Sequence, residues 1–171
     1  MGHVSYSEEI NATPEQVWAV ISDVTRLPDW AYKERGQNYP VEGKYGSDQR
    51  EGVGTIWVGV SADGQTATQK ITAWEPPAQL AYQLEAMENS AVNMSQTSTF
   101  TLEPAGDGTK ITWAVDWELG GGFSLNKLLL WFTGNSAFEE MIAGSLENLK
   151  TLLESLPPAD EGAGTPDQAA E

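Results

Sequence analysis

Cysteine is absent from this 171-residue chain, histidine occurs once, and only nine Lys and Arg residues stand against 25 Asp and Glu residues. Without cysteine, disulfides, thiolate nucleophiles and zinc–sulfur sites are excluded. The single histidine, His3, lies at the very start of the chain, so a serine–histidine–acid triad has no general base. The acidic residues are scattered and do not follow metal-ligand spacings. We therefore expect no metal and no other cofactor.

Positive charge and long apolar runs are also scarce. The formal net charge is −16 at pH 7, which disfavours binding to phosphate backbones and to anionic lipid head groups. The longest apolar run, residues 128–132, is too short to span a bilayer, and residues 1–10 have no signal-peptide pattern. These features predict a cytoplasmic protein that binds no nucleic acid and is not an integral membrane protein.

The end of the chain differs in composition from the rest. Residues 157–171 are rich in Pro, Gly, Ala and acidic residues and contain no aromatic residue. Such a segment cannot bury enough apolar surface to offset the conformational entropy lost on folding. We expect one domain over residues 1–156, followed by a disordered acidic tail over residues 157–171.

A long amphipathic helix is predicted in the C-terminal third, after the glycines at 120–122. Its apolar residues recur at steps of three and four over about eight turns. They are Leu128, Trp131, Phe132, Phe138, Met141, Ile142, Leu149, Leu152 and Leu153. A helix of this length needs a partner, and a curved sheet is the natural one. A cavity between sheet and helix would be the place for function.

The sequence before this helix reads mostly as strands. A strand at 3–11 is followed by two short helices, the first with an N-cap signature at Thr13 and Pro14. Asp63-Gly64 and the loop 104–108 mark hairpins. The further predicted strands are 37–45, 53–60, 66–74, 80–85, 92–102 and 109–118. This order predicts an α+β protein with a mostly antiparallel meander.

Several segments carry a resemblance to a known superfamily. They are residues 12–18, 21–23, 27–30, 52–55, 106–112 and 145–150, together with the most specific piece, Thr72-Ala73-Trp74-Glu75-Pro76-Pro77 followed by Leu80-Ala81-Tyr82. Together they resemble the START-like, helix-grip superfamily (SRPBCC), and within it the polyketide cyclase/dehydrase-type branch. The resemblance implies a curved antiparallel sheet of about seven strands around a long C-terminal helix, with two short helices between strands 1 and 2.

Strand parity indicates which residues are candidates for ligand binding. Trp113 and Trp117 share a face with Ile111 and Val115. If that face is concave, the two indoles line a cavity; otherwise they fill a core. The full candidate set is Trp57, Tyr82, Met94, Gln96, Ser98, Trp113, Trp117, Trp131, Phe138 and Ile142.

Two of these candidates have special features. The parity of Trp57 is ambiguous because Ile56 and Val58 compete for the inner face. An inward Tyr82 must find a hydrogen-bond partner in a ligand, a trapped water or another protein group. Tyr82 is also the catalytic candidate, as a hydroxyl able to orient or protonate a carbonyl oxygen.

Two classes of function follow from these observations. The first is binding of a small hydrophobic or aromatic ligand, lipid- or polyketide-like, in an internal cavity between the sheet and the C-terminal helix. The alternative is a polyketide cyclase/aromatase or dehydratase that acts on a poly-ketone chain mainly by shaping it. The lack of a clustered acid–base pair favours binding. A third possibility is a cavity filled by its own aromatic residues, in a protein that binds another protein.

Overall fold

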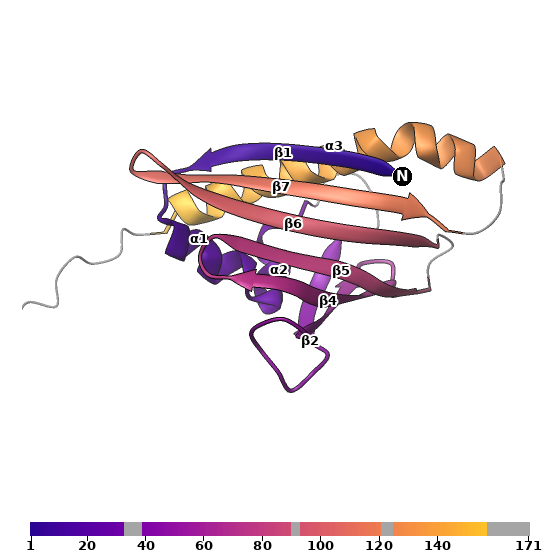
Figure 1. Cartoon of the computed structure of the whole chain (residues 1–171), viewed down its shortest axis with the longest axis horizontal. Coiled ribbons are helices and arrows are strands. Elements are labelled where there is room, and N and C mark those ends of the chain that lie inside the picture. Colours follow the sequence, from indigo (N-terminus) through magenta and orange to yellow (C-terminus); the bar gives the residue numbers. More distant parts are fainter. Residues whose placement is uncertain (33–38, 90–92, 121–124, 157–171) are drawn as a thin grey trace, which may run out of the picture.

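The computed structural model describes residues 1–32, 39–89, 93–120 and 125–156, with only the backbone described for 125–134. Its strands form one curved antiparallel sheet in the order β1-β7-β6-β5-β4-β3-β2 (Figure 1). They are β1 (Gly2–Ile10), β2 (Pro40–Tyr45), β3 (Ile56–Ser61), β4 (Thr66–Glu75), β5 (Gln79–Glu88), β6 (Met94–Ala105) and β7 (Gly108–Leu119).

The helices are α1 (Pro14–Ile21), the 3-10 turn η1 (Val24–Arg26), α2 (Leu27–Trp30) and α3 (Leu125–Glu154). The short helices lie between β1 and β2 in the chain, and α3 ends the described part. The predicted α+β helix-grip fold is therefore confirmed. The predicted tail, 157–171, and two of the glycines at 120–122 lie outside the described residues. No described helix is long and apolar enough to cross a membrane.

Helix α1 begins as its sequence predicts. The Thr13 hydroxyl accepts a hydrogen bond from the Gln16 backbone N–H, and the Gln16 side chain accepts one from the Thr13 N–H at 2.8 Å. This capping box satisfies two backbone donors at the helix start. Trp18 of α1 is only half-buried. It packs edge-to-face against Trp74, with ring centroids 5.2 Å apart, because both indoles lie at the outer border of the core.

The strand register fixes which side chains face the helices. Phe100 of β6 lies opposite Leu80 of β5 and Trp113 of β7, so all three point to one face. Each of these side chains is buried. Trp57 is buried on β3, whereas its neighbours Ile56 and Val58 are half-buried. The inner face of β3 therefore belongs to Trp57, which removes the ambiguity left by the sequence.

The long helix covers one side of this concave face. Helix α3 packs on β1 and β7, and Figure 1 shows it running along these strands. The chain leaving α2 is bonded to α3, because the Tyr32 N–H donates to the Ser145 hydroxyl at 3.0 Å and the Tyr32 hydroxyl donates to Glu140 at 3.0 Å. Gly144 permits this contact, since a Cβ there would lie 2.1 Å from the Tyr32 ring. These contacts hold α2 over the sheet beside α3.

Candidate functional site

A small internal cavity lies between the short helices and the sheet. Its volume is about 10 Å³, room for about one water molecule. No described residue of α3 lines it. Its walls come from α1, η1, α2 and the residue before η1 (Ile21, Asp23, Val24, Leu27, Trp30) and from strands β3 to β6 (Trp57, Gln69, Tyr82, Phe100).

Five aromatic side chains form a continuous cluster, and four of them line this cavity. We call Trp30, Trp57, Tyr82, Phe100 and Trp113 the aromatic cluster; Trp113 lies outside the cavity lining. Neighbouring ring centroids lie 5.9 Å apart for Trp57 and Tyr82, 6.2 Å for Tyr82 and Phe100, and 4.6 Å for Phe100 and Trp113. Trp30 completes the cluster from α2, with its ring 5.9 Å from that of Trp113. These separations are typical of stabilising aromatic pairs.

The tryptophans of the aromatic cluster have polar atoms that no described residue pairs with. The indole N–H groups of Trp30, Trp57 and Trp113 are buried and have no hydrogen-bond acceptor among the described residues. The three side chains are at most 5% exposed, so bulk water does not reach these donors. A buried donor without a partner costs about 1–3 kcal/mol. Their concentration in one cluster is the most unusual chemical feature of the interior.

Tyr82 belongs to a short polar chain at the edge of the aromatic cluster. Gln96 Nε2 donates to Ser98 Oγ at 3.1 Å, and Ser98 hydrogen-bonds Tyr82. Burial raises the pKa of Tyr82 to about 12, and the hydrogen bond from Ser98 opposes this rise. The phenol is therefore neutral at physiological pH. It can donate a hydrogen bond to a carbonyl oxygen but cannot act as a general base.

A second group of predicted site residues lies toward α3. The Trp117 N–H donates to Asn135 Oδ1 at 3.2 Å, and its ring lies 5.7 Å from that of Phe138. Gly2 lies opposite Trp117 on β1, where a Cβ would lie 2.3 Å from the indole. Trp117 thus fills a closely fitting space between β1 and α3, and its N–H is satisfied.

The ten predicted site residues are thus divided between two places. Trp57, Tyr82 and Trp113 belong to the aromatic cluster, and Ser98 and Gln96 extend from it. Trp117, Phe138 and the fully buried Ile142 lie with α3. Met94 is half-buried at the start of β6, and the side chain of Trp131 lies outside the described part of the chain.

Sequence reasoning missed Trp30 and Phe100 as site residues. Trp30 lies in a four-residue helix, too short to show a periodic pattern. Phe100 shares strand parity with the candidates Ser98 and Gln96, and that parity was a usable signal.

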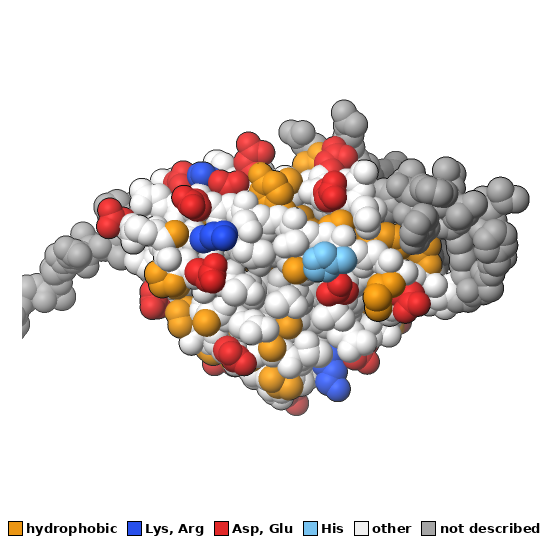
Figure 2. Space-filling view, turned by 45° about the horizontal axis from the view of Figure 1, so that its top comes forward, with side chains coloured by type: hydrophobic (Ala, Val, Ile, Leu, Met, Phe, Trp, Pro, Cys, Tyr) orange, Lys and Arg blue, Asp and Glu red, His pale blue; other side chains and the backbone are white. Residues whose placement is uncertain are grey.

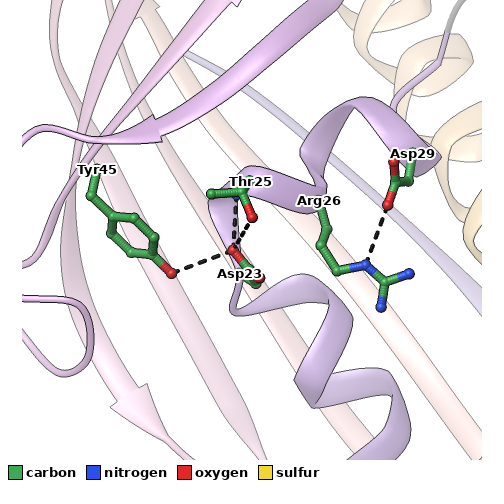
Figure 3. Close-up of polar contacts among 5 residues, drawn as sticks. All are labelled: Asp23, Thr25, Arg26, Asp29 and Tyr45. Atoms are coloured by element: carbon green, nitrogen blue, oxygen red, sulfur yellow. Dashed lines mark hydrogen bonds and ion pairs between the residues drawn. The ribbon is translucent and has the colours of Figure 1, made fainter.

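An acidic side chain closes one edge of the cavity. Asp23 Oδ1 accepts hydrogen bonds from the Thr25 N–H at 2.9 Å, the Thr25 hydroxyl at 2.7 Å and the Tyr45 hydroxyl at 3.4 Å (Figure 3). Burial, followed by the negative charge of Asp23, raises the pKa of Tyr45. Nearby, Arg26 Nε donates to Asp29 Oδ2 at 3.2 Å. Asp23 therefore fixes the turn of η1 and connects it to β2.

The outer surface offers less chemistry. Figure 2 shows acidic side chains scattered among uncharged ones, with the single histidine beside an acid. That residue, His3, lies 2.8 Å from Asp116 through Nδ1, and both side chains are more than half exposed. Among the described residues, no group of three or more His, Asp or Glu side chains is placed to hold a metal ion.

Solved structures share this fold at low sequence identity. A protein from Rhodobacter sphaeroides is 20% identical, with a TM-score of 0.65 over 91% of this chain and 93% of that chain. The protein XoxI from Bacillus cereus is 18% identical, with a TM-score of 0.63 over 91% and 97% of the two chains. DynU16, a protein of the dynemicin biosynthetic locus, is 14% identical, with a TM-score of 0.62 over 90% of this chain and 47% of its own.

A comparison with curated proteins finds no match. The family model described as polyketide cyclase/dehydrase and lipid transport, in contrast, matches residues 1–154. This match covers every described helix and strand. The chain therefore belongs to the polyketide cyclase/dehydrase and lipid transport family.

Proposed function

We propose that this protein binds a small hydrophobic or aromatic molecule, lipid- or polyketide-like, at the aromatic cluster inside the sheet. The observation that carries this proposal is a buried cluster of five aromatic rings, four of which line the cavity, whose three indole N–H groups have no partner among the described residues. A ligand would supply the missing partners and stack on the rings. Membership of a family whose description includes lipid transport supports the same function.

Binding requires the interior to open. The cavity of about 10 Å³ holds no organic ligand. Its sheet side is fixed by the ladder hydrogen bonds of β3 to β6, whereas its other wall is formed largely by η1 and α2, of three and four residues. We expect this short-helix wall to move outward when a ligand enters, because individual hydrogen bonds, such as those from Tyr45 to Asp23 and from Tyr32 to Ser145, join it to the rest of the protein in place of a strand ladder.

A cyclase or dehydratase is the second candidate function, favoured by one observation. The hydroxyl of Tyr82 lies in the aromatic cluster and is held neutral, as needed to donate a hydrogen bond to a carbonyl oxygen. A base is less evident, because the buried polar residues among those described are Thr55, Ser98, Thr109 and Ser145. Binding therefore remains the first candidate.

Intrinsic tryptophan fluorescence tests the proposal. In a panel of flavonoids, fused-ring aromatics, sterols and fatty acids, at least one compound should quench at micromolar concentration, which corresponds to about 8 kcal/mol. Trp57→Phe and Trp113→Phe should weaken that binding. Trp18→Phe is the matched control, because Trp18 packs on Trp74 outside the aromatic cluster, and it should leave affinity unchanged.

Two outcomes would argue against binding as the function. If no compound quenches and the native protein carries no co-purifying small molecule, the proposal fails. If a linear poly-ketone is converted into a ring at a rate that Tyr82→Phe lowers, the enzyme reading replaces it.

A further inference from the structure

The unpaired donors of the aromatic cluster also define the ligand's chemistry. We infer that the part of the ligand buried there is uncharged and carries hydrogen-bond acceptors such as carbonyl or ether oxygens. This inference rests on the proposed function and goes beyond it, since a hydrophobic ligand in general could be a hydrocarbon, an alcohol or a fatty acid.

The indoles favour acceptors. A tryptophan N–H is a donor only, so each of Trp30, Trp57 and Trp113 can be satisfied by an acceptor and by nothing else. A hydrocarbon would leave all three donors buried and unpaired, whereas a carbonyl oxygen can accept from two donors. The protein therefore gains more from an acceptor-bearing ligand than from an apolar one of the same shape.

The charges around the cavity disfavour an anion. The charged side chain among the described residues that line it is Asp23, an acid. Nearby, the Arg26 side chain donates to Asp29, and the Arg50 side chain lies over the Tyr45 ring at 4.6 Å. Among the described residues that line the cavity, a buried carboxylate would therefore face a negative charge and find no cation to pair with, which is strongly unfavourable. Fatty acids and other carboxylates should be poor ligands at their charged end.

A trapped water is the competing explanation for the unpaired donors. The cavity has room for about one water molecule. Trp30 and Trp57 line this cavity and Trp113 does not, so a water there can accept from at most those two indoles and leaves the Trp113 N–H unsatisfied. An acceptor-bearing ligand accounts for all three, and the competing explanation predicts no preference among ligands.

Three compounds of nearly the same shape separate these explanations: fluorene, 9-fluorenone and 9-fluorenone-2-carboxylate. Their affinities for the full chain would be measured by isothermal titration calorimetry at pH 7. Fluorenone should bind roughly three- to ten-fold more tightly than fluorene for each hydrogen bond gained. A purely apolar pocket would show the opposite order, because fluorenone is better solvated by water. The carboxylate should bind at least about ten-fold more weakly than fluorenone.

Variants assign the preference to the indoles. Trp57→Phe and Trp30→Phe each remove one N–H while keeping an aromatic ring. Each should reduce the ratio of fluorenone affinity to fluorene affinity by roughly three- to ten-fold. Trp18→Phe should leave the ratio unchanged. The ratio is used because a loss of stability shifts both affinities together. The use of two variants keeps the test informative if one of them fails to fold.

Each outcome has one reading. The inference is supported if fluorenone binds more tightly than fluorene and if the ratio of the two affinities falls in both variants. Equal or tighter binding of fluorene overturns it but leaves the proposed function standing, and tightest binding of the carboxylate overturns the statement about charge. If neither these compounds nor any of the wider panel binds, the proposed function fails and the inference falls with it.

Discussion

The concave face of the sheet has two sides that are packed in different ways. Under α3, the described interior is mainly aliphatic, with Ile111, Val115, Ile142, Leu146 and Leu149 fully buried, and the N–H of Trp117 is paired with Asn135. Under η1 and α2, the interior is aromatic, contains a cavity, and buries three indole N–H groups without partners among the described residues. One sheet thus supports both a close-packed core and an incompletely satisfied site.

This difference separates stability from function. Aliphatic side chains have no polar atoms to satisfy, so the α3 side contributes hydrophobic stabilisation without an opposing penalty. The aromatic cluster also buries apolar area, but each unpaired N–H opposes part of that gain. Local features that reduce stability are expected where a protein binds or reacts, and rarely elsewhere. The aromatic cluster is therefore the better candidate for a ligand site than the α3 side.

The largest effect should come from breaking the α3 side. Leu146→Ala removes a fully buried side chain from the close-packed half, and we expect the free energy of unfolding to fall by about 2–5 kcal/mol. Phe138→Ala removes a larger side chain from the same helix, but Phe138 is only half-buried beside Trp117. The free energy of unfolding should therefore fall by less than the value of about 3–5 kcal/mol that is typical when a fully packed Phe is truncated.

Urea denaturation of Leu146→Ala and Phe138→Ala would measure the two losses of unfolding free energy. Ligand affinity, measured on folded protein, should change little in Leu146→Ala because Leu146 belongs to the α3 side. A penalty for Phe138→Ala equal to that of a fully buried aromatic would show a completely filled interior at that end of the helix.

A smaller effect should appear at high pH on the aromatic side. Burial raises the pKa of Tyr82 from its ordinary value of 10.0 to about 12 in the folded protein. The unfolded chain therefore loses this proton first, so the stabilisation is fully present below pH 10 and is lost as the pH rises toward 12. The loss is about 2–3 kcal/mol for a shift of this size.

Urea unfolding between pH 9 and pH 12 would test this, with Tyr82→Phe compared against wild type. Tyr82→Phe should lack this part of the decline in unfolding free energy with rising pH. The variant is nevertheless less stable at pH 9, because it loses the Ser98 hydrogen bond. Tyr6→Phe is the control, because Tyr6 is 42% exposed, and its decline should match that of wild type. Identical slopes for wild type and Tyr82→Phe would contradict a buried phenol.

Much of this architecture could be predicted from local patterns in the sequence. The parity of Trp113 and Trp117 with Ile111 and Val115 placed all four on the inner face, where they are buried. The N-cap pattern at Thr13 predicted where α1 begins. Both signals depend on residues close together in the chain, which is why they could be read without a structure.

The division of the site could not be predicted in the same way. Whether an indole N–H is satisfied depends on a residue from another element, as with Asn135 of α3 for Trp117. The position of Trp30 depends on how α2 is bonded to α3 through Tyr32 and Ser145. Such contacts join distant parts of the chain and leave no periodic signal. Sequence parity therefore predicted inward residues but not which of them share a cavity.

The smallest expected effect is a difference between two tryptophans that strand parity places on the same inner face. Trp57 and Trp117 are 4% and 3% exposed and both face the helices. Truncating either to Phe removes a similar part of the ring. Trp117→Phe also removes the hydrogen bond to Asn135, worth about 0.5–1.5 kcal/mol. Trp57→Phe removes a donor that has no partner among the described residues, so part of its packing loss should be offset.

We therefore expect Trp117→Phe to lower the free energy of unfolding by about 1–2 kcal/mol more than Trp57→Phe does, in protein stripped of ligand. Chemical denaturation of the two variants measures the difference directly. Repeating the measurement with saturating ligand should narrow or reverse it, because a ligand acceptor gives the Trp57 N–H a partner that the variant cannot use. Equal losses without ligand, unchanged by its addition, would mean that the two sides of the sheet do not differ in their polar pairing, and the contrast between them would rest on packing alone.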